Sequence, residues 1–414
     1  MLVPGLTATN RESMTIIKTL IGLGVAIIPF FCLSGYNTRE PKMVLALVIS
    51  LLIGLSAFFF GLLKPIKNIF ALCLVGFLAL NMYLAPKFNI AFLGLRITNP
   101  WIWETGAKIL IFFLLYCVMS SIDLSKKDKN LLFSAMVWCG FIMSAYSLFQ
   151  YAGADQFFVV KTGEAPFSKI ATGGTLGQYT LVSSFIAMLF PLSIYQKRWG
   201  FSLIMGIALF IMDSQVAWGA LVLSMLVYVA LKSKAWLFII IALLVLSVIA
   251  ISFTPILKNP KAAEITSTTG RLFVWDKIID AATRPFTETT RKTFPMTGMG
   301  VGSFQYLIYE HAPRLRGFQG EVRWIEAHNE YVEWFYTSGI IGLILMLLTI
   351  AWIIKASFIP WAGLFSLGPE RRALLASFIC ICVCAFGTFV WHLGAHIFYT
   401  IVIAGLLSKS KGEF

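Results

Sequence analysis

The chain has 414 residues, of which 58% are hydrophobic and only 13% are charged. An ordinary soluble domain carries roughly 25% charged residues, so a water-soluble globule of this composition would lack the polar surface needed to face water. The formal net charge of +14 would favour nucleic-acid binding in a soluble protein. Here lysine and arginine concentrate in short segments between apolar runs, a pattern typical of cytoplasmic loops in membrane proteins. The expected solvent is therefore lipid, and nucleic acid is not an expected partner.

Apolar runs of about 20 residues, the length that crosses the hydrocarbon core of a bilayer, recur along the chain. About twelve are predicted, near 15–35, 43–63, 66–86, 101–121, 131–152, 176–195, 200–213, 215–231, 235–254, 329–354, 373–390 and 392–408. The seventh and eighth are short and nearly continuous around Asp213, so one of them is expected to be tilted or broken there. The first run lacks a small-residue cleavage site, which favours a span over a removed signal peptide.

Charges in the connecting segments orient the predicted spans. One set of alternate loops and the N-terminus carries most of the positive charge and is assigned to the cytoplasmic side. Its members are Arg11, Lys18, Lys64, Lys67, Lys126, Lys127, Lys129, Lys197, Arg198, Lys232, Lys234, Lys355, Arg371, Arg372, Lys409 and Lys411. The other short loops carry little positive charge. This assignment puts both termini in the cytoplasm.

The fold class predicted from these runs is an all-α integral membrane protein with one large outer loop that contains short helices. Residues 1–254 form an N-terminal bundle of about nine helices, 255–328 form the loop, and 329–414 form about three C-terminal helices. The loop is basic, but long loops cross the membrane largely regardless of charge. We see no internal repeat, which weighs against transporter folds built from duplicated halves.

The outer loop contains a segment with helical spacing that starts at Arg271. Trp275 and Ile278 fall on its apolar side, and acidic residues fall on the other. The helix is expected to lie in the membrane interface with Arg271 in its first turn. The alternative is a surface helix whose arginine only meets lipid phosphates. Asp276 and Asp280 lie one turn apart and are conceivable ligands of a divalent metal, but a solvated polar face is favoured.

Three alternating glycines, at positions 298, 300 and 302, follow in the same loop. A dinucleotide-binding fingerprint has similar glycines, but it needs a preceding strand and a following helix within a βαβ unit. The stretch is also predicted to lie outside the nucleotide pool of the cell. We expect a tight turn at which the backbone approaches a neighbouring segment or a phosphate.

The loop ends at His328, downstream of Arg323 and beside acidic residues. A histidine with an ordinary pKa of about 6.5 is suited to act as a base near neutral pH. The alternative is an interfacial histidine that only caps the next helix.

Two further pairs of ionisable residues lie at predicted outer ends of spans. Glu104 and Lys108 are one turn apart, where charge is costly and often functional, although a neutral salt bridge is an equal alternative. His392 and His396 are also one turn apart. Interfacial packing is favoured for these histidines over a metal site because no third ligand lies nearby in the sequence.

Together, three motifs resemble the O-antigen ligase and O-antigen polymerase superfamily, which includes related protein-glycosylating transferases. The first is Gly270-Arg271 with Trp275, and the second is the glycine-rich stretch from Gly298 to Phe304. The third is His328-Asn329 with Gly339 eleven positions after the histidine (339 − 328). Their order, spacing and place in the long outer loop resemble the family pattern over roughly residues 265–345.

The resemblance implies a function at the periplasmic face of the bacterial inner membrane. Family members transfer a glycan from an undecaprenyl-diphosphate carrier to an acceptor hydroxyl, and arginines hold the diphosphate. Carried over by position, His328 would be the catalytic base and Arg271 a diphosphate ligand. Supporting residues would be Trp275, Gly300, Asn329 and Gly339. No cofactor and no metal are expected.

One position departs from the family pattern. Family members often carry a Ser-Arg pair near the outer end of a mid-chain span, where the arginine is a second basic anchor. The counterpart here is Ser214-Gln215, and the Gln215 side chain has no charge. The second anchor is then lost or supplied elsewhere, with Lys169, Lys108 and Arg323 as the alternatives.

Within the family, ligation to the lipid A core is favoured slightly over repeat-unit polymerisation and over transfer to protein. Two other classes of protein stay open at this stage. A transporter or flippase of lipid-linked sugars would be expected to carry mid-membrane ionisable groups and paired broken helices. A non-catalytic assembly protein would not need the arginine and histidine pattern.

Overall fold

A computed structural model describes most of the predicted bundle and parts of the outer loop. The described residues are 5–32, 39–84, 106–154, 172–231, 275–276, 278–279, 294–301, 304, 327–358 and 367–409. The predicted span 235–254 and the residues Glu104, Lys169, Arg271 and Arg323 lie outside the described residues. Within the described ranges every regular element is a helix.

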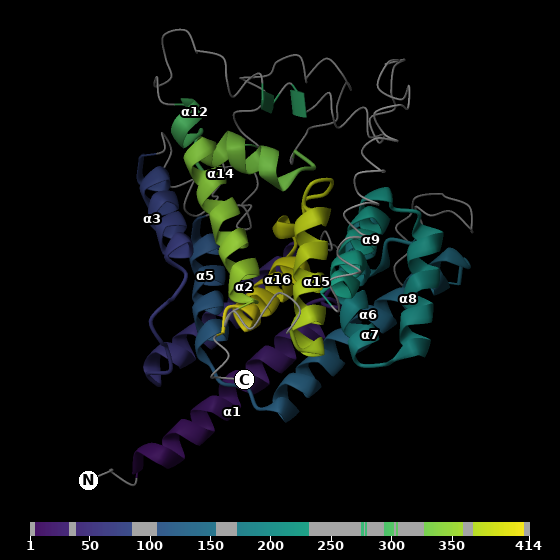
Figure 1. Cartoon of the computed structure of the whole chain (residues 1–414), viewed down its shortest axis with the longest axis horizontal. Helices are drawn as coiled ribbons and strands as arrows, with labels where there is room; N and C mark the ends of the chain where they lie inside the picture. Colours follow the sequence, from purple (N-terminus) through teal and green to yellow (C-terminus); the bar gives the residue numbers. More distant parts are fainter. Residues whose placement is uncertain are drawn as a thin grey trace.

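The helices follow the predicted apolar runs (Figure 1). Their bounds are α1 Gly5–Ile27, α2 Arg39–Phe59, α3 Ile69–Leu84, α5 Gly106–Ser121, α6 Lys126–Tyr151, η3 Gly174–Leu176, α7 Tyr179–Tyr195, α8 Trp199–Met212, α9 Gln215–Ala230, α12 Phe294–Thr297, α14 Glu330–Ala356, α15 Pro369–Cys384, η6 Val390–His392 and α16 Gly394–Leu407. Each predicted run except 235–254 overlaps one of these helices, which confirms the all-helical prediction for the described residues.

Three helices in the described part of the chain, α2, α6 and α14, are long and apolar enough to cross a membrane by themselves. Six other apolar helices are shorter, between 10 and 17 residues. The full count of twelve spans stays a prediction.

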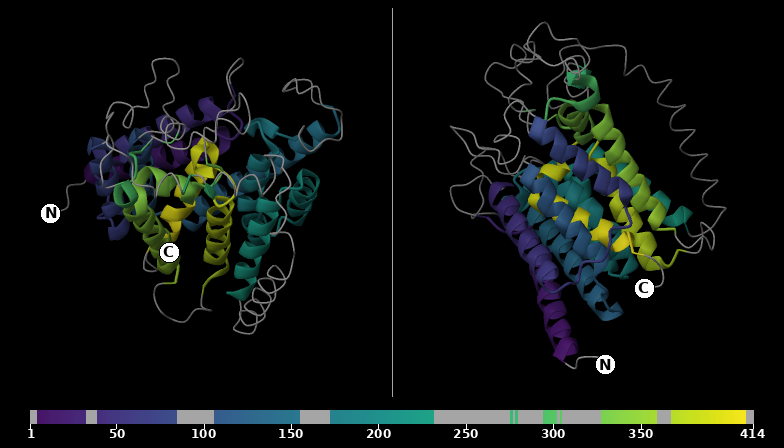
Figure 2. Two further views of the ribbon diagram at one scale, coloured as in Figure 1. Left: turned by 90° about the horizontal axis from the view of Figure 1, so that it is seen from above. Right: turned by 90° about the vertical axis from the view of Figure 1, so that its left-hand side faces the viewer.

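The centre of the bundle is formed by α7, α15 and α16. Helix α16 packs against α2, α5 and α15, and α7 packs against α6, α8, α9 and α15. Figure 2 shows α15 and α16 between α14 on one side and α8 and α9 on the other. Helices that are apolar on all sides are expected at such central positions. His396 fits this environment because its Nε2 lies 3.0 Å from the Leu181 carbonyl oxygen and its side chain is fully buried.

Outward-facing surfaces of the peripheral helices are strongly apolar. Large hydrophobic side chains on α2, α3, α6, α8 and α14 are exposed, among them Val48, Leu52, Ile69, Leu80, Leu131, Phe210 and Ile344. A soluble monomer rarely exposes apolar surface over so many elements. These faces are the ones expected to contact lipid, as in a membrane protein.

Charged residues predicted for the cytoplasmic side meet at one end of the bundle. The Lys64 and Lys409 ammonium groups lie 2.9 and 3.8 Å from Asp123 carboxylate oxygens. Lys129 lies 3.6 Å from Glu370. The structure therefore agrees with the grouping of these residues, whereas the cytoplasmic orientation of that end stays a prediction.

The helical conformation is interrupted between α8 and α9, as the sequence indicates. Asp213 has a left-handed backbone with φ of 46°, and the Ser214 side chain accepts a hydrogen bond from the Ala217 amide at the start of α9. Gln215 is thus the first residue of α9.

Helix α14 is also broken, at Gly339, where the backbone has φ of 66° and ψ of −171°. Figure 1 shows its first part lying across one end of the bundle and its second part running down along the bundle. The single span predicted over 329–354 is therefore two helical pieces, and the break turns the start of α14 towards the loop side.

Candidate active site

His328 lies two positions before the first residue of α14, and Asn329 between them caps this helix. The Asn329 side-chain oxygen accepts hydrogen bonds from the amides of Tyr331 at 3.0 Å and Val332 at 3.2 Å. Asparagine is among the best residues for this capping position. Asn329 therefore caps α14, and the alternative in which His328 is the cap is wrong.

The backbone at His328 is left-handed, with φ of 51°. Such values are uncommon outside glycine and tend to gather at functional sites, where the surrounding structure holds them. The His328 ring contacts the Phe389 ring edge to face, with centroids 5.0 Å apart. His328 is therefore held in an unusual conformation against the segment that joins α15 to α16.

Hydrogen bonds to both backbone groups of Ala327 restrain the chain just before His328. The Ala327 amide donates to Glu333 Oε2 at 2.9 Å, and the Ala327 carbonyl oxygen accepts a hydrogen bond from Trp275 Nε1 at 2.8 Å. Trp275, predicted to support the site, is thus brought to the residue next to His328.

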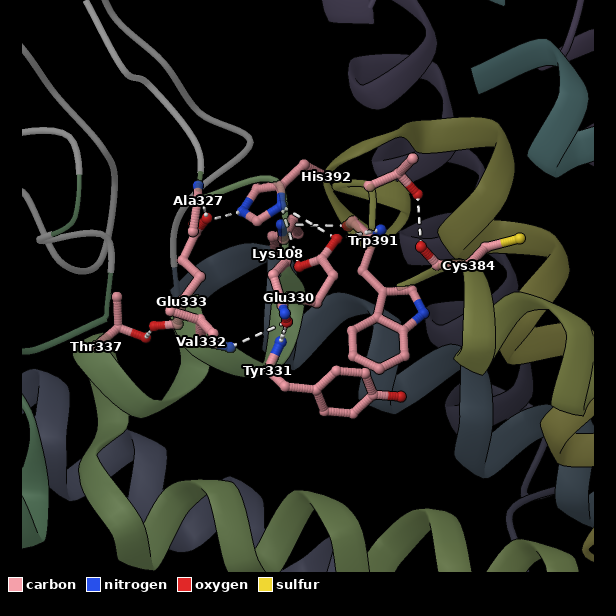
Figure 3. Close-up of polar contacts among 12 residues, drawn as sticks. Lys108, Ala327, Glu330, Tyr331, Val332, Glu333, Thr337, Cys384, Trp391 and His392 are labelled. Atoms are coloured by element: carbon pink, nitrogen blue, oxygen red, sulfur yellow. Dashed lines mark hydrogen bonds and ion pairs between the residues drawn. The ribbon is translucent and has the colours of Figure 1, made fainter. Parts of the chain in front are cut away.

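A buried cluster of four ionisable side chains lies at the start of α14 (Figure 3). We call Lys108, Glu330, Glu333 and His392 the charged cluster. His392 Nδ1 lies 3.2 Å from Glu330 Oε2, and His392 Nε2 lies 3.1 Å from Glu333 Oε1. The side chain of His392 is 11% exposed, that of Glu330 1% and that of Glu333 7%. These contacts are therefore made away from water.

The protonation of His392 follows from its two partners. An imidazolium donates from both ring nitrogens, which matches a ring with a carboxylate at each nitrogen. Two carboxylates within ion-pair distance favour the charged form of the ring over the neutral one. The geometry therefore favours a positively charged His392.

The charged cluster joins three elements. Glu330 Oε1 accepts from the Trp391 amide at 2.6 Å, and the Glu330 amide donates to the Ala385 carbonyl oxygen at 2.9 Å. The Lys108 ammonium on α5 donates to the Trp391 carbonyl oxygen at 3.5 Å. Two carboxylates are thus balanced by one lysine and one imidazolium, which is how buried charges are tolerated.

An apolar cavity of about 240 Å³ extends from the charged cluster between α3, α5, α14 and α16. All four residues of the charged cluster line it, together with Trp391. Farther along, its walls are apolar, with residues such as Leu78, Phe112, Ile350, Ile353, Ile401 and Ala404. His328 is not part of the lining; it precedes Glu330 by two positions.

The glycine-rich turn docks on the break in α14. Amides of Met299 and Gly300 donate to the carbonyl oxygens of Tyr336 at 3.0 Å and Thr337 at 2.9 Å. A Cβ atom on Gly339 would lie 2.4 Å from the Met296 carbonyl oxygen. The predicted close backbone approach to a neighbouring segment is confirmed, and that neighbour is α14.

We predict that Gly339→Ala destabilises the protein and that Gly76→Ala does not. Alanine at position 339 would have to adopt a positive φ and would meet backbone atoms of the glycine turn, for a combined cost of at least about 1–3 kcal/mol. A Cβ atom on Gly76 of α3 meets nothing within 4 Å. Thermal unfolding of the detergent-purified variants measures the difference. Equal melting temperatures for the two variants would contradict the packing described for the turn.

Most of the predicted site residues in the described part of the chain lie at the same end of the bundle. His328, Asn329 and Trp275 lie at the start of α14. Gly300 contacts Thr337 of this helix, two positions before the break at Gly339. Lys108 belongs to the charged cluster. Gln215 is exposed, and the adjacent Val216 packs on Gly387 in the segment between α15 and η6. Arg271, Arg323 and Lys169 lie outside the described residues.

Sequence reasoning did not identify Glu330, Glu333, His392 and Phe389 as part of the site. A usable signal was present: two acidic residues three positions apart begin an otherwise apolar helix, where ionisable groups are rare and usually functional. His392 was expected to pack at the interface together with His396. Packing is correct for His396, whereas His392 is an ionic partner of two carboxylates.

The comparison with family models matches residues 200–347 to the family described as O-Antigen ligase. Over this stretch, about a third of the chain, the sequence is similar to the O-antigen ligase family. The matched stretch includes α9, His328 and the break in α14. Lys108 and His392 of the charged cluster lie outside it. No curated protein matches the chain.

Proposed function

We propose that this chain belongs to the O-antigen ligase superfamily and is a glycosyltransferase of the bacterial inner membrane. It moves a glycan from an undecaprenyl-diphosphate carrier to an acceptor hydroxyl on the periplasmic face. The family match supports a membrane glycosyltransferase of the O-antigen ligase and polymerase type. The observation that carries the proposal is His328, held in a left-handed backbone beside a charged cluster that heads an apolar cavity.

The proposed reaction requires a base and a stabilised leaving group. The acceptor oxygen attacks the anomeric carbon of the glycan, the bond from that carbon to the diphosphate breaks, and undecaprenyl diphosphate leaves. His328 receives the proton of the acceptor hydroxyl, which requires hydrogen-bond reach between the two groups. Proton transfer of this kind contributes typically 10²–10⁴-fold to a rate.

Arg271 is proposed to hold the diphosphate. A guanidinium presents a fixed fork of donors that matches phosphate oxygens better than a lysine point charge. Donors placed where charge develops often supply the largest catalytic contribution. The contact between Trp275, four positions after Arg271, and Ala327 supports the approach of this segment to His328.

The apolar cavity is proposed to take part of the polyprenyl chain. Its walls are mostly hydrocarbon, and its charged end lies towards the start of α14. Exposed apolar faces of α3 and α14 flank it, which suits a substrate that arrives from the bilayer. A donor bound in this way would present its diphosphate near the end of the bundle that carries His328.

The second basic anchor is proposed to come from Arg323 or Lys169. Gln215 has no charge, and Lys108 interacts electrostatically with Glu333 and His392. The charge of Lys108 is thus already balanced within the charged cluster, which weakens its case as a diphosphate ligand. The proposed topology places the loop 255–328 in the periplasm between the bundles 1–254 and 329–414, with both termini in the cytoplasm.

A transporter of lipid-linked sugars is the second candidate function. The break in α14 and the buried charged cluster are features that such proteins also show. The two functions differ in product, because a transporter moves the donor across the membrane without forming a new glycosidic bond.

Complementation of ligase-deficient cells tests the proposed function. The wild-type chain is expected to restore an O-antigen ladder on a lipopolysaccharide gel, and Arg271→Ala is expected to remove that ladder at equal membrane abundance. Lys127→Ala, in a segment assigned to the cytoplasmic side, is the control that should keep the ladder. A wild-type chain that restores nothing would oppose ligation to the lipid A core and favour a polymerase or a protein-glycosylating transferase. A ladder that survives Arg271→Ala would exclude Arg271 as a required ligand.

A further inference from the structure

His392 cannot serve as a base in the arrangement described, although it lines the cavity. Each of its ring nitrogens faces a carboxylate oxygen, at 3.2 Å for Nδ1 with Glu330 and 3.1 Å for Nε2 with Glu333. A histidine that donates from both nitrogens has no lone pair for a substrate proton. The role of His392 is therefore sought in the contacts that its partner Glu333 makes.

Glu333 connects His392 to the chain next to His328. Its Oε1 lies 3.1 Å from His392 Nε2, and its Oε2 accepts a hydrogen bond from the Ala327 amide at 2.9 Å. Each carboxylate oxygen therefore has a separate partner, and the imidazolium fixes the orientation in which the carboxylate meets Ala327. The Ala327 carbonyl oxygen, which belongs to the peptide group shared with His328, accepts a hydrogen bond from Trp275 Nε1.

These contacts bear directly on the conformation of His328. A left-handed φ for a residue other than glycine is of higher energy and persists only where the surroundings enforce it. Glu333 and Trp275 restrain the residue before His328, and the Asn329 cap restrains the residue after it. Without the hold of Glu333 on Ala327, the His328 backbone would be free to relax and its ring would shift.

We propose that Glu333 and His392 are positioning residues for His328, with the imidazolium of His392 orienting Glu333 so that its carboxylate clamps Ala327. The inference rests on the proposed role of His328 as the base of the transfer reaction. A reacting group displaced by about 1 Å can lose roughly 100-fold in rate, so a contact that acts only through the backbone can have a large effect.

The orientation of Glu333, and with it the hydrogen bond to Ala327, depends on the charge of His392. The groups that face His392 are Glu330 and Glu333 from α14 and Lys108 from α5. The imidazolium can donate to both carboxylates, whereas a neutral ring can donate to only one of them. A fall in kcat is therefore expected at alkaline pH, where His392 loses its proton, for the wild type and not for His392→Gln.

Two measurements on protein in lipid nanodiscs test the proposal, with Glu333→Ala, Glu333→Gln and His392→Gln as variants. The first is transfer kinetics with an undecaprenyl-diphosphate-linked oligosaccharide and lipid A core. The second is the rate at which diethyl pyrocarbonate modifies His328, followed by peptide mass spectrometry. Asp123→Asn, which changes an ion pair at the opposite end of the bundle, is the control. The fully buried His396 is an internal reference.

Glu333→Ala is expected to lower kcat by about 10- to 100-fold, with little change in the donor KM, and to change the modification rate of His328. Glu333→Gln should have a kcat and a modification rate between those of Glu333→Ala and the wild type, because its amide oxygen can still accept a hydrogen bond from the Ala327 amide. It also guards against a Glu333→Ala protein that does not fold. Asp123→Asn should match the wild type.

Unchanged kcat and unchanged His328 modification in both Glu333→Ala and His392→Gln would overturn the proposal, as would an effect confined to the donor KM. A wild type that transfers no glycan would instead count against the proposed function. The modification rates would then still decide whether Glu333 and His392 position His328.

Discussion

Replacing His328 by alanine is expected to lower glycan transfer by about 10²–10⁴-fold, the usual contribution of a general base. The acceptor hydroxyl would keep its binding site but lose the group that takes its proton. His328→Gln should be similarly inactive, because an amide fills the space without accepting a proton near neutral pH. Initial rates of transfer in membranes with matched protein levels measure both variants.

The control for this experiment is again Asp123→Asn, far from the start of α14 and expected to transfer at the wild-type rate. Retention of more than half of the wild-type rate by His328→Ala would remove the base from the proposed mechanism. Its left-handed backbone and contact with Phe389 would then have to be explained by structure alone.

Filling the apolar cavity is expected to weaken donor binding. Val75 on α3 is half-buried and lines the cavity, and tryptophan at this position would occupy space proposed for the polyprenyl chain. Exclusion of about two to three methylene groups at ~0.8 kcal/mol each corresponds to a rise in donor KM of roughly 15- to 60-fold. Initial rates of transfer as a function of donor concentration measure this change.

Leu72→Trp is the matched control, because Leu72 lies on the same helix, is 40% exposed and does not line the cavity. Its donor KM should equal that of the wild type. Equal donor KM values for Val75→Trp and Leu72→Trp would show that the chain of the donor lies elsewhere.

The helical frame was predictable because the length of an apolar run decides whether a segment spans a bilayer. Each described helix longer than one turn lies where such a run was expected. His328, Asn329 and Gly339 could be singled out because their spacing resembles a known family pattern. The break between α8 and α9 was predictable as well, since Asp213 interrupts two apolar runs that are each too short.

The charged cluster was not predictable because it depends on tertiary structure. Glu333 and His392 are 59 positions apart (392 − 333), and no local pattern shows that the turn before α16 returns to the start of α14. The break at Gly339 was hidden for a different reason. A single glycine in an apolar run is tolerated within a helix, and only the packing of Met296 and Thr297 against Gly339 makes the positive φ necessary.

Transfer by the purified protein tests the central claim most directly. The wild-type chain in nanodiscs would be mixed with an undecaprenyl-diphosphate-linked oligosaccharide and lipid A core, and the lipids would be analysed by mass spectrometry. We expect a lipid A core that has gained the oligosaccharide and an equal amount of released undecaprenyl diphosphate, with neither formed by His328→Ala. Donor that stays intact with lipid A core, with a repeat-unit glycan and with an acceptor protein alike would contradict the assignment of this chain as a glycosyltransferase.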